Sequence, residues 1–132
     1  MASYEPVLAN PLVVVVDDDA AVRGSLKFAL EIEGFAVRTY PKGDDLLGDV
    51  RCADCACFII DQKLPGMNGL DVVAELRKGH IAAPVILITS HPTNILLERA
   101  ARAGVPIVEK PLLGNALIDR IRDAIAHPPT AH

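Results

Sequence analysis

The sequence predicts one α/β domain: a doubly wound, five-stranded parallel sheet with five helices. Five short aliphatic runs recur along the chain at fairly even spacing, and a segment with helical periodicity follows each of them. This strict alternation favours a parallel sheet whose right-handed crossovers place helices on both faces. The predicted strands cover residues 12–16, 35–40, 57–60, 85–89 and 107–109.

The first, third and fourth runs are apolar without regular alternation. That pattern is typical of strands that are covered on both faces in a parallel sheet. The second run alternates more, because it contains Arg38 and Thr39. Pro106 stands at the start of the fifth run, and since proline cannot donate a ladder hydrogen bond, we expect this strand at a sheet edge.

Apolar residues three and four apart trace the helices. Asp19 is placed to cap the first helix, and Gly34 stands where that helix should stop. Gly79 and Gly104 stand at the expected ends of the third and fourth helices. The five predicted helices cover residues 22–33, 46–50, 70–77, 96–103 and 117–125.

The length of 132 residues fits one domain of ordinary size. We expect this domain over residues 11–126, with flexible tails at 1–10 and 127–132. Aromatic residues make up only 4% of the chain, so its core must be aliphatic.

The net charge is −4 and no lysine and arginine cluster exists, which argues against a nucleic acid partner. The longest apolar runs are far shorter than the ~20 residues that a membrane span needs. The N-terminus lacks the basic-then-apolar pattern of an export signal. We therefore expect a cytoplasmic protein that does not enter a membrane.

Three cysteines, Cys52, Cys55 and Cys57, fall within six residues. The first two form a Cys-x-x-Cys pair, which can bind metal or form a disulfide, and His80 is the next candidate ligand. No second such pair exists, and an odd count in a reducing compartment favours free thiols. We interpret the cysteines as structural, while a redox role of the first two stays open.

Chemically active residues follow the predicted strands, at the edge where open α/β sheets bind ligands. In order, the first, third, fourth and fifth strands lead into Asp17-Asp18-Asp19, Asp61, Thr89-Ser90 and Glu109-Lys110. Neighbouring carboxylates repel one another, and a hard cation such as Mg²⁺ resolves that conflict. One carboxylate can then attack phosphorus while the hydroxyl and the ammonium neutralise phosphoryl oxygens. Together these residues predict aspartyl phosphorylation.

Each residue taken singly has a simpler interpretation. Asp19 alone is more readily a helix cap than a ligand. A threonine that ends a strand is usually structural, and a lone lysine is usually solvated. Pro65-Gly66 is a common turn pair. The prediction therefore depends on their joint occurrence at the ends of four strands.

With these residues the chain resembles the receiver domains of bacterial response regulators, above all the branch that includes nitrogen-fixation regulators. The resemblance runs from about Leu12 to Ile125, and it implies a flavodoxin-like receiver fold with strand order 2-1-3-4-5. Its most specific parts are Val-Val-Asp-Asp-Asp-x-x-x-Arg from Val15 to Arg23, Asp-x-x-Leu-Pro-x-Met-x-Gly from Asp61 to Gly69, Thr89-Ser90 and Lys110-Pro111.

The resemblance implies that Asp61 is the phosphoacceptor. It implies that Asp17 and Asp18 hold Mg²⁺, or Mn²⁺ in its place, with Asp18 a direct ligand and Asp17 acting partly through water. The backbone carbonyl of Lys63 would complete the protein ligands.

By the same resemblance, Thr89 binds a phosphoryl oxygen and reports its presence by moving, and Lys110 pairs with another phosphoryl oxygen. The Lys110–Pro111 peptide bond is expected to be cis. Ser90 is small, as access to the acceptor requires. Lys63 and His91, two residues beyond Asp61 and Thr89, are candidates for tuning hydrolysis, with simple solvation the open alternative.

The chain departs from the family around the fifth strand. Ile107 stands where the family usually has an aromatic residue three positions before the lysine. The stretch 104–110 is one residue short, and Leu112 replaces the common aromatic residue after Lys-Pro. We expect intact phosphorylation chemistry and an atypical output surface.

The resemblance implies a phosphoacceptor regulator that receives its phosphoryl group from a sensor histidine kinase or a histidine phosphotransfer protein and then switches protein contacts. It would be no enzyme beyond its own phosphorylation and slow dephosphorylation. We expect no DNA-binding output domain, although a fragment of a longer protein stays open. A homodimer through the fourth helix, fifth strand and fifth helix is a further hypothesis.

Two other classes remain as alternatives. Asp17-x-Asp19 also fits the opening of a haloacid-dehalogenase-type phosphatase, which uses its first aspartate as nucleophile. A pseudo-receiver that docks without phosphorylation is the other. Mononucleotide binding is disfavoured because no glycine-rich loop follows the first strand.

Overall fold

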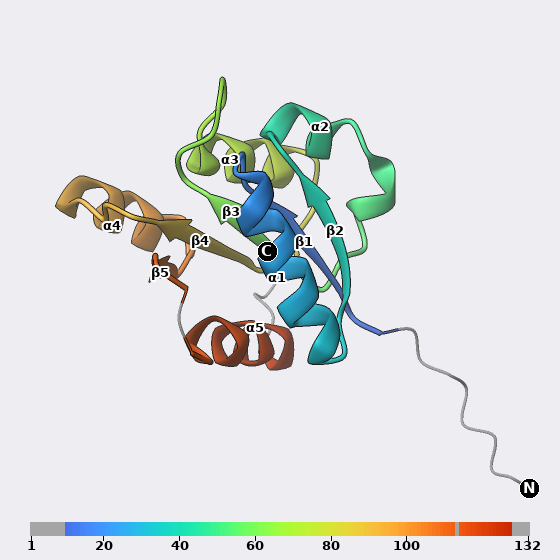
Figure 1. The fold of residues 1–132 in the computed structure, drawn as a ribbon. Coiled ribbons are helices and arrows are strands. Elements are labelled where there is room, and N and C mark those ends of the chain that lie inside the picture. Colours follow the sequence, from blue (N-terminus) through green and yellow to red (C-terminus); the bar gives the residue numbers. More distant parts are fainter. Residues whose placement is uncertain (1–9, 113, 128–132) are drawn as a thin grey trace, which may run out of the picture.

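Five parallel strands form one sheet in the order β2-β1-β3-β4-β5, as expected (Figure 1). The computed structural model describes residues 10–112 and 114–127, so most of the two expected tails lies outside the described residues. The strands are β1 (Leu12–Val16), β2 (Ala36–Tyr40), β3 (Cys57–Asp61), β4 (Val85–Thr89) and β5 (Ile107–Glu109). The predicted edge position of β5 is confirmed.

The helices are α1 (Ala20–Ile32), α2 (Gly43–Leu47), α3 (Gly69–Lys78), α4 (Asn94–Arg102) and α5 (Ala116–Ala126). The predicted second helix over 46–50 was partly wrong. α2 begins earlier and ends at Leu47, and a separate 3-10 turn covers Val50–Cys52. Gly48 caps α2 with its N–H on the carbonyl of Asp44, and the chain leaves the helix there.

The helices cover the two faces of the sheet in two layers (Figure 1). Val13 and Val15 of β1 pack with α1 and α5 on one face, where Leu30 and Ile121 are buried. Val14 and Val16 of the same strand face α2, α3 and α4 on the other side. Because successive side chains in a strand point to opposite faces, the unbroken apolar runs fill both layers.

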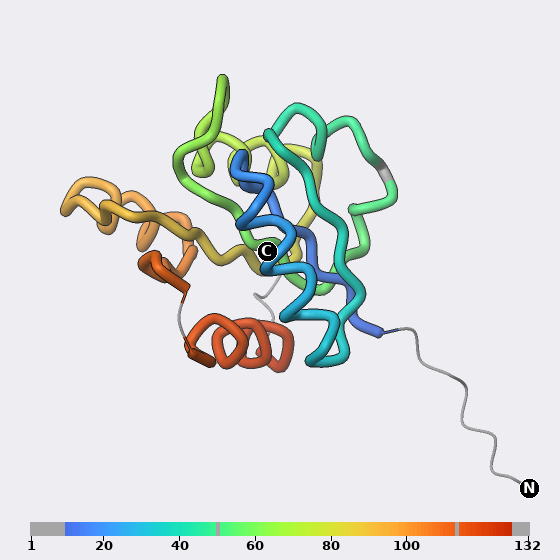
Figure 2. Tube along the Cα trace, in the orientation of Figure 1, coloured from blue at the N-terminus to red at the C-terminus, as the bar shows by residue number. Residues whose placement is uncertain are grey.

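The ladders align the carboxyl ends of four strands at one edge of the sheet. Asp61 of β3 pairs with Ile88 of β4, and Thr89 pairs with Glu109 of β5. The segment between β3 and α3 projects beyond this edge (Figure 2). The residues that follow the strands therefore meet at one place, as the alternating pattern predicted.

The three cysteines are free and buried, in agreement with the structural interpretation. Burial raises the pKa of Cys55 and Cys57 to about 12, so both thiols are protonated at neutral pH. No helix within residues 10–112 and 114–127 is long and apolar enough to cross a membrane.

Gly69 allows α3 to start directly against the end of β3. A Cβ atom at this position would lie 2.8 Å from the carbonyl oxygen of Asp61 and 2.9 Å from the Cα of Gln62. Both neighbours are backbone atoms, which cannot move without shifting the phosphoacceptor candidate. A side chain at position 69 is therefore excluded by packing.

We predict that Gly69→Ala lowers the free energy of unfolding by about 2 kcal/mol or more, because overpacking forces the backbone to shift. Urea denaturation measures the change. Gly79→Ala is the matched control, since its Cβ would meet only ordinary contacts of 3.5 Å and more. It should change the free energy of unfolding by less than about 0.5 kcal/mol, and equal effects of the two variants would contradict the packing argument.

Candidate functional site

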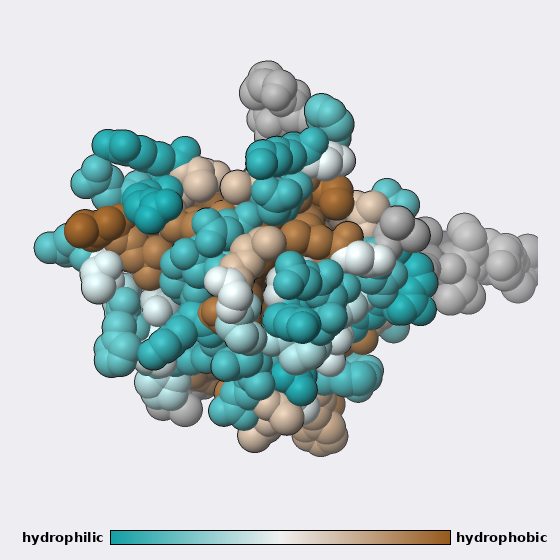
Figure 3. Space-filling view, turned by 90° about the horizontal axis from the view of Figure 1, so that it is seen from above, coloured by the Kyte–Doolittle hydropathy of each residue, from teal (hydrophilic) through white to brown (hydrophobic). Residues whose placement is uncertain are grey.

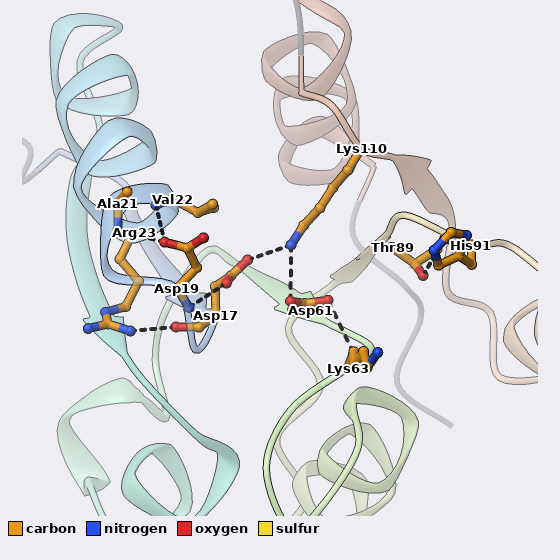
Figure 4. A network of polar contacts seen from close by, with 10 residues as sticks. All are labelled: Asp17, Asp19, Ala21, Val22, Arg23, Asp61, Lys63, Thr89, His91 and Lys110. Atoms are coloured by element: carbon orange, nitrogen blue, oxygen red, sulfur yellow. Dashed lines mark hydrogen bonds and ion pairs between the residues drawn. The ribbon is translucent and has the colours of Figure 1, made fainter.

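Side chains from the ends of four strands meet at the carboxyl edge of the sheet (Figure 4). Asp17 follows β1, Asp61 ends β3, Thr89 ends β4 and Lys110 follows β5. Asp17, Asp61 and Thr89 are the buried polar residues of the described chain. Buried charges need partners, so the contacts among these groups decide whether the edge is stable.

Lys110 supplies that partner. Its Nζ donates to Oδ2 of Asp17 and to Oδ2 of Asp61, at 3.0 Å in each case. The ammonium thus bridges two carboxylates that come from different strands (Figure 4). Although burial lowers the pKa of Lys110, its hydrogen bonds to both aspartates raise the pKa above the ordinary lysine value, so the ammonium stays charged.

Asp61 is held on both oxygens. The backbone N–H of Lys63 donates to Oδ1 at 3.1 Å, while Lys110 binds Oδ2. Burial nevertheless raises the pKa of Asp61 above the ordinary carboxyl value, against the opposing hydrogen bonds from Lys110 and Lys63. An oriented and poorly solvated carboxylate is suited to attack an electrophile that enters the cleft.

The acidic turn after β1 is fixed by its own hydrogen bonds. Oδ1 of Asp17 accepts from the N–H of Asp19 at 2.9 Å, and Asp19 caps α1 by accepting from Ala21 and Val22. The predicted cap role of Asp19 is confirmed. Arg23 donates from Nη1 to the backbone carbonyl of Asp17 at 2.7 Å, and this hydrogen bond ties α1 to the acidic turn (Figure 4).

Asp17, Asp18 and Asp61 can offer one oxygen each to a common ion, with these oxygens within 4.8 Å of one another. Asp18 is exposed, whereas the other two are buried. Three oxygen ligands beside open cleft fit a hard divalent cation, which keeps several waters when it is bound by carboxylates. The residues present therefore fit the expected Mg²⁺.

Thr89 points into the same cleft, and its Oγ1 accepts from the N–H of His91 at 3.2 Å. This contact leaves the hydroxyl proton of Thr89 free to be donated to a ligand. Ser90 and His91 are exposed, and both line the cleft together with Lys63. The cleft has a volume of about 920 Å³.

The Lys110–Pro111 peptide bond is cis, as expected. Ile107 is half-buried and packs on the α4 side of the sheet. Beside it lies a hollow of about 360 Å³ between α4 and β5. The hollow is lined by Leu97, Ala100, Ala101, Gly104, Val105, Pro106 and Ile107.

A family model described as the response regulator receiver domain matches residues 13–122. The chain belongs to this family. The match covers β2 to β5 and all of β1 except its first residue, and it contains every residue of the site described above.

Among curated proteins, this receiver domain is 38% identical over 115 residues to the C4-dicarboxylate transport transcriptional regulatory protein DctR of Rhodobacter capsulatus. That alignment covers 85% of this chain and 58% of the relative. It is 30% identical over 114 residues to the transcriptional regulatory protein FixJ of Bradyrhizobium diazoefficiens, covering 86% and 56%. The chain thus spans about half the length of these relatives, which are named as transcriptional regulators.

Solved structures agree with the fold. The crystal structure of FixJ-N superimposes with a TM-score of 0.81 at 29% identity, covering 93% of this chain and 99% of that one. The receiver domain of a putative LuxO repressor protein from Vibrio parahaemolyticus gives a TM-score of 0.82 at 24% identity, covering 89% and 91%. The second likeness bears on the fold alone.

The structure brings together all the residues predicted for phosphorylation: Asp17, Asp18, Asp61, Thr89 and Lys110. Sequence reasoning missed two arginines. Arg23 belongs to the quoted motif, but only the fold reveals its bond to the carbonyl of Asp17. Arg99 lines the cleft from α4, and no motif had singled it out.

We predict that Asp61→Asn stabilises the metal-free protein at pH 7. A carboxyl whose pKa is higher in the fold than in the unfolded chain stabilises the fold below about pH 4, and this contribution is lost as the pH rises through the raised pKa. Asparagine cannot ionise, so Asp61→Asn keeps this stabilising contribution at pH 7, where the wild type has lost it. The difference in the free energy of unfolding between the variant and the wild type should therefore shrink toward acid pH.

Urea denaturation in the presence of a chelator, between pH 3.5 and 8, measures this difference. Asp54→Asn, an exposed carboxylate outside the cleft, is the control and should change little. A metal-free Asp61→Asn variant that is less stable than the wild type at pH 7 would contradict the role of burial at this position.

Proposed function

We propose that this receiver domain accepts a phosphoryl group from a phosphohistidine onto Asp61, with Mg²⁺ bound by Asp17, Asp18, Asp61 and the carbonyl of Lys63. The observation that carries the proposal is the placement of Asp61, which Lys110 and Lys63 hold in a cleft that is lined by four aspartates. Phospho-His of a sensor histidine kinase or of a histidine phosphotransfer protein is the donor.

The transfer is an in-line displacement at phosphorus. A carboxylate oxygen of Asp61 forms a bond to phosphorus while the bond from phosphorus to the imidazole nitrogen breaks, and the imidazole keeps the electron pair. Lys110 Nζ, which donates a hydrogen bond to Asp61 before the reaction, donates to a phosphoryl oxygen as negative charge develops on the phosphoryl group. The hydroxyl of Thr89 donates to another phosphoryl oxygen. When bound, Mg²⁺ would neutralise the carboxylates and polarise the phosphoryl group.

Phosphorylation changes the balance of charge at the edge. The aspartyl phosphate carries a charge of about −2, where the carboxylate carried −1. Lys110, which follows β5, and Thr89, which ends β4, are drawn toward the new oxygens. Such a change biases a two-state equilibrium, with couplings of typically 1–3 kcal/mol. Because position 107 is isoleucine and not an aromatic residue, the surface around β5 changes without the movement of an aromatic side chain at that position.

The phosphorylated domain acts through protein contacts in the cytoplasm, with a homodimer through α4, β5 and α5 as one such contact. Lys63 and His91, at the rim of the cleft, set the rate at which water reaches the aspartyl phosphate.

The alternatives are less well supported. A phosphatase nucleophile at Asp17 is disfavoured because the Asp17 side chain has no exposed surface, whereas the Asp61 side chain is 6% exposed. If that function were present, a small phosphate ester would be turned over, and changing Asp17 but not Asp61 would abolish turnover. A pseudo-receiver is disfavoured by the complete set of acceptor, acidic pair, hydroxyl and ammonium.

We predict that acetyl phosphate and Mg²⁺ add one phosphoryl group per chain, measured by intact-mass spectrometry. Asp61→Asn should take up none, because it lacks the nucleophile. Lys110→Gln should slow the reaction by about 100-fold, the typical loss for one electrostatic donor. A chelator should prevent the reaction.

Asp119→Asn and Lys78→Gln serve as controls, because both side chains lie outside the cleft. They should be phosphorylated at the wild-type rate. A phosphoryl group that still appears on Asp61→Asn, or wild-type protein that takes up none at any Mg²⁺ concentration, would refute the proposed function.

A further inference from the structure

The lining of the cleft that contains Asp61 extends beyond the residues proposed to hold the phosphoryl group and the cation. The volume of the cleft is about 920 Å³. The rest of the cleft extends between the segment after β3 and the start of α4. We call this part the outer trough, and it is lined by Lys63, Leu64, Thr93, Ile95, Leu96 and Arg99.

The outer trough is positively charged. Lys63 borders it from the loop after β3 and Arg99 from α4, and neither forms an ion pair within the described residues. Thr93 caps α4 through the N–H of Leu96, so the positive end of the helix dipole borders the trough as well. The inner end of the cleft carries the aspartates. The cleft is therefore polarised, negative inside and positive toward α4.

The trough also has an apolar component. Leu64 and Leu96 are 9% exposed, whereas Ile95 is 73% exposed. Ile95 and Arg99 are four residues apart and lie on one face of α4. In the view from above, hydrophobic surface lies among hydrophilic surface on the α4 side of the molecule (Figure 3). An exposed isoleucine beside an unpaired arginine is complementary to a carboxylate next to an apolar side chain.

We propose that the outer trough receives a segment of the phosphodonor protein that carries a carboxylate and an apolar side chain beside its phosphohistidine. The inference rests on the proposed function. Because the trough and the acceptor site are parts of one cleft, a donor that brings its phosphoryl group to Asp61 also covers the trough. The carboxylate pairs with Arg99 and Lys63, and the apolar side chain covers Ile95. The trough thereby contributes to the choice of donor.

Two synthetic phosphohistidine peptides test this inference. One carries glutamate and leucine beside the phosphohistidine, and the other carries lysine and leucine. We expect the glutamate peptide to phosphorylate the wild-type protein about two- to fivefold faster at low salt, as an exposed ion pair allows. The preference should decline as salt screens the charges. The ratio of the two rates is the measured quantity, so a change in reactivity at Asp61 affects both rates alike and cancels.

Arg99→Glu should abolish or invert the ratio, and Arg99→Lys should retain it. Arg120→Glu on α5 is the matched control, because it makes the same change of charge outside the cleft. Equal rates for the two peptides in the wild type, or a ratio that Arg99→Glu leaves unchanged, would overturn the inference. Acetyl phosphate distinguishes a failure of the proposed function from a failure of this inference. If acetyl phosphate does not phosphorylate the wild type, the proposed function is wrong. If it does but the two peptides react at equal rates, only the role of the outer trough is wrong.

Discussion

The bridge that Lys110 makes between Asp17 and Asp61 is the interaction on which this edge of the sheet depends. Two buried carboxylates from neighbouring strands repel each other and lose hydration, and both effects oppose folding. One ammonium, 3.0 Å from an oxygen of each, offsets that penalty and fixes where the carboxylates point. The same arrangement is ready for chemistry, because a cation and a phosphoryl group can take over the contacts that Lys110 makes to the two carboxylates.

The fold supplies this bridge through its topology. β1 and β3 are adjacent in the sheet, and β5 lies at the edge beyond β4, so Lys110 reaches back across the carboxyl end of β4. Gly69 lets α3 start against the carbonyl of Asp61, and Arg23 ties α1 to the carbonyl of Asp17. Stability and function are therefore in tension at Asp61, whose burial favours the protonated form while its proposed role requires the ionised one.

The strands and most helices could be predicted from the sequence because unbroken aliphatic runs and helical periodicity are local signals. The second helix was misplaced because Leu46, Leu47 and Val50 share a spacing that Gly48 interrupts. The candidate site was also predictable, since the ends of parallel strands meet at one edge. What could not be predicted was pairing over long separations, such as Lys110 with Asp17, 93 positions apart. The place of Arg99 depends on how α4 packs, which no local pattern encodes.

The central claim is that folding turns Asp61 into a cation-dependent nucleophile. Its most direct test is chemical mapping: after reaction with a phosphodonor, borohydride reduces an aspartyl phosphate to homoserine, and peptide mass spectrometry locates the product. The account predicts homoserine at position 61 in samples that contained Mg²⁺ and none in chelated samples. Homoserine at position 17 or 18, or the same yield at position 61 without a divalent cation, would contradict it.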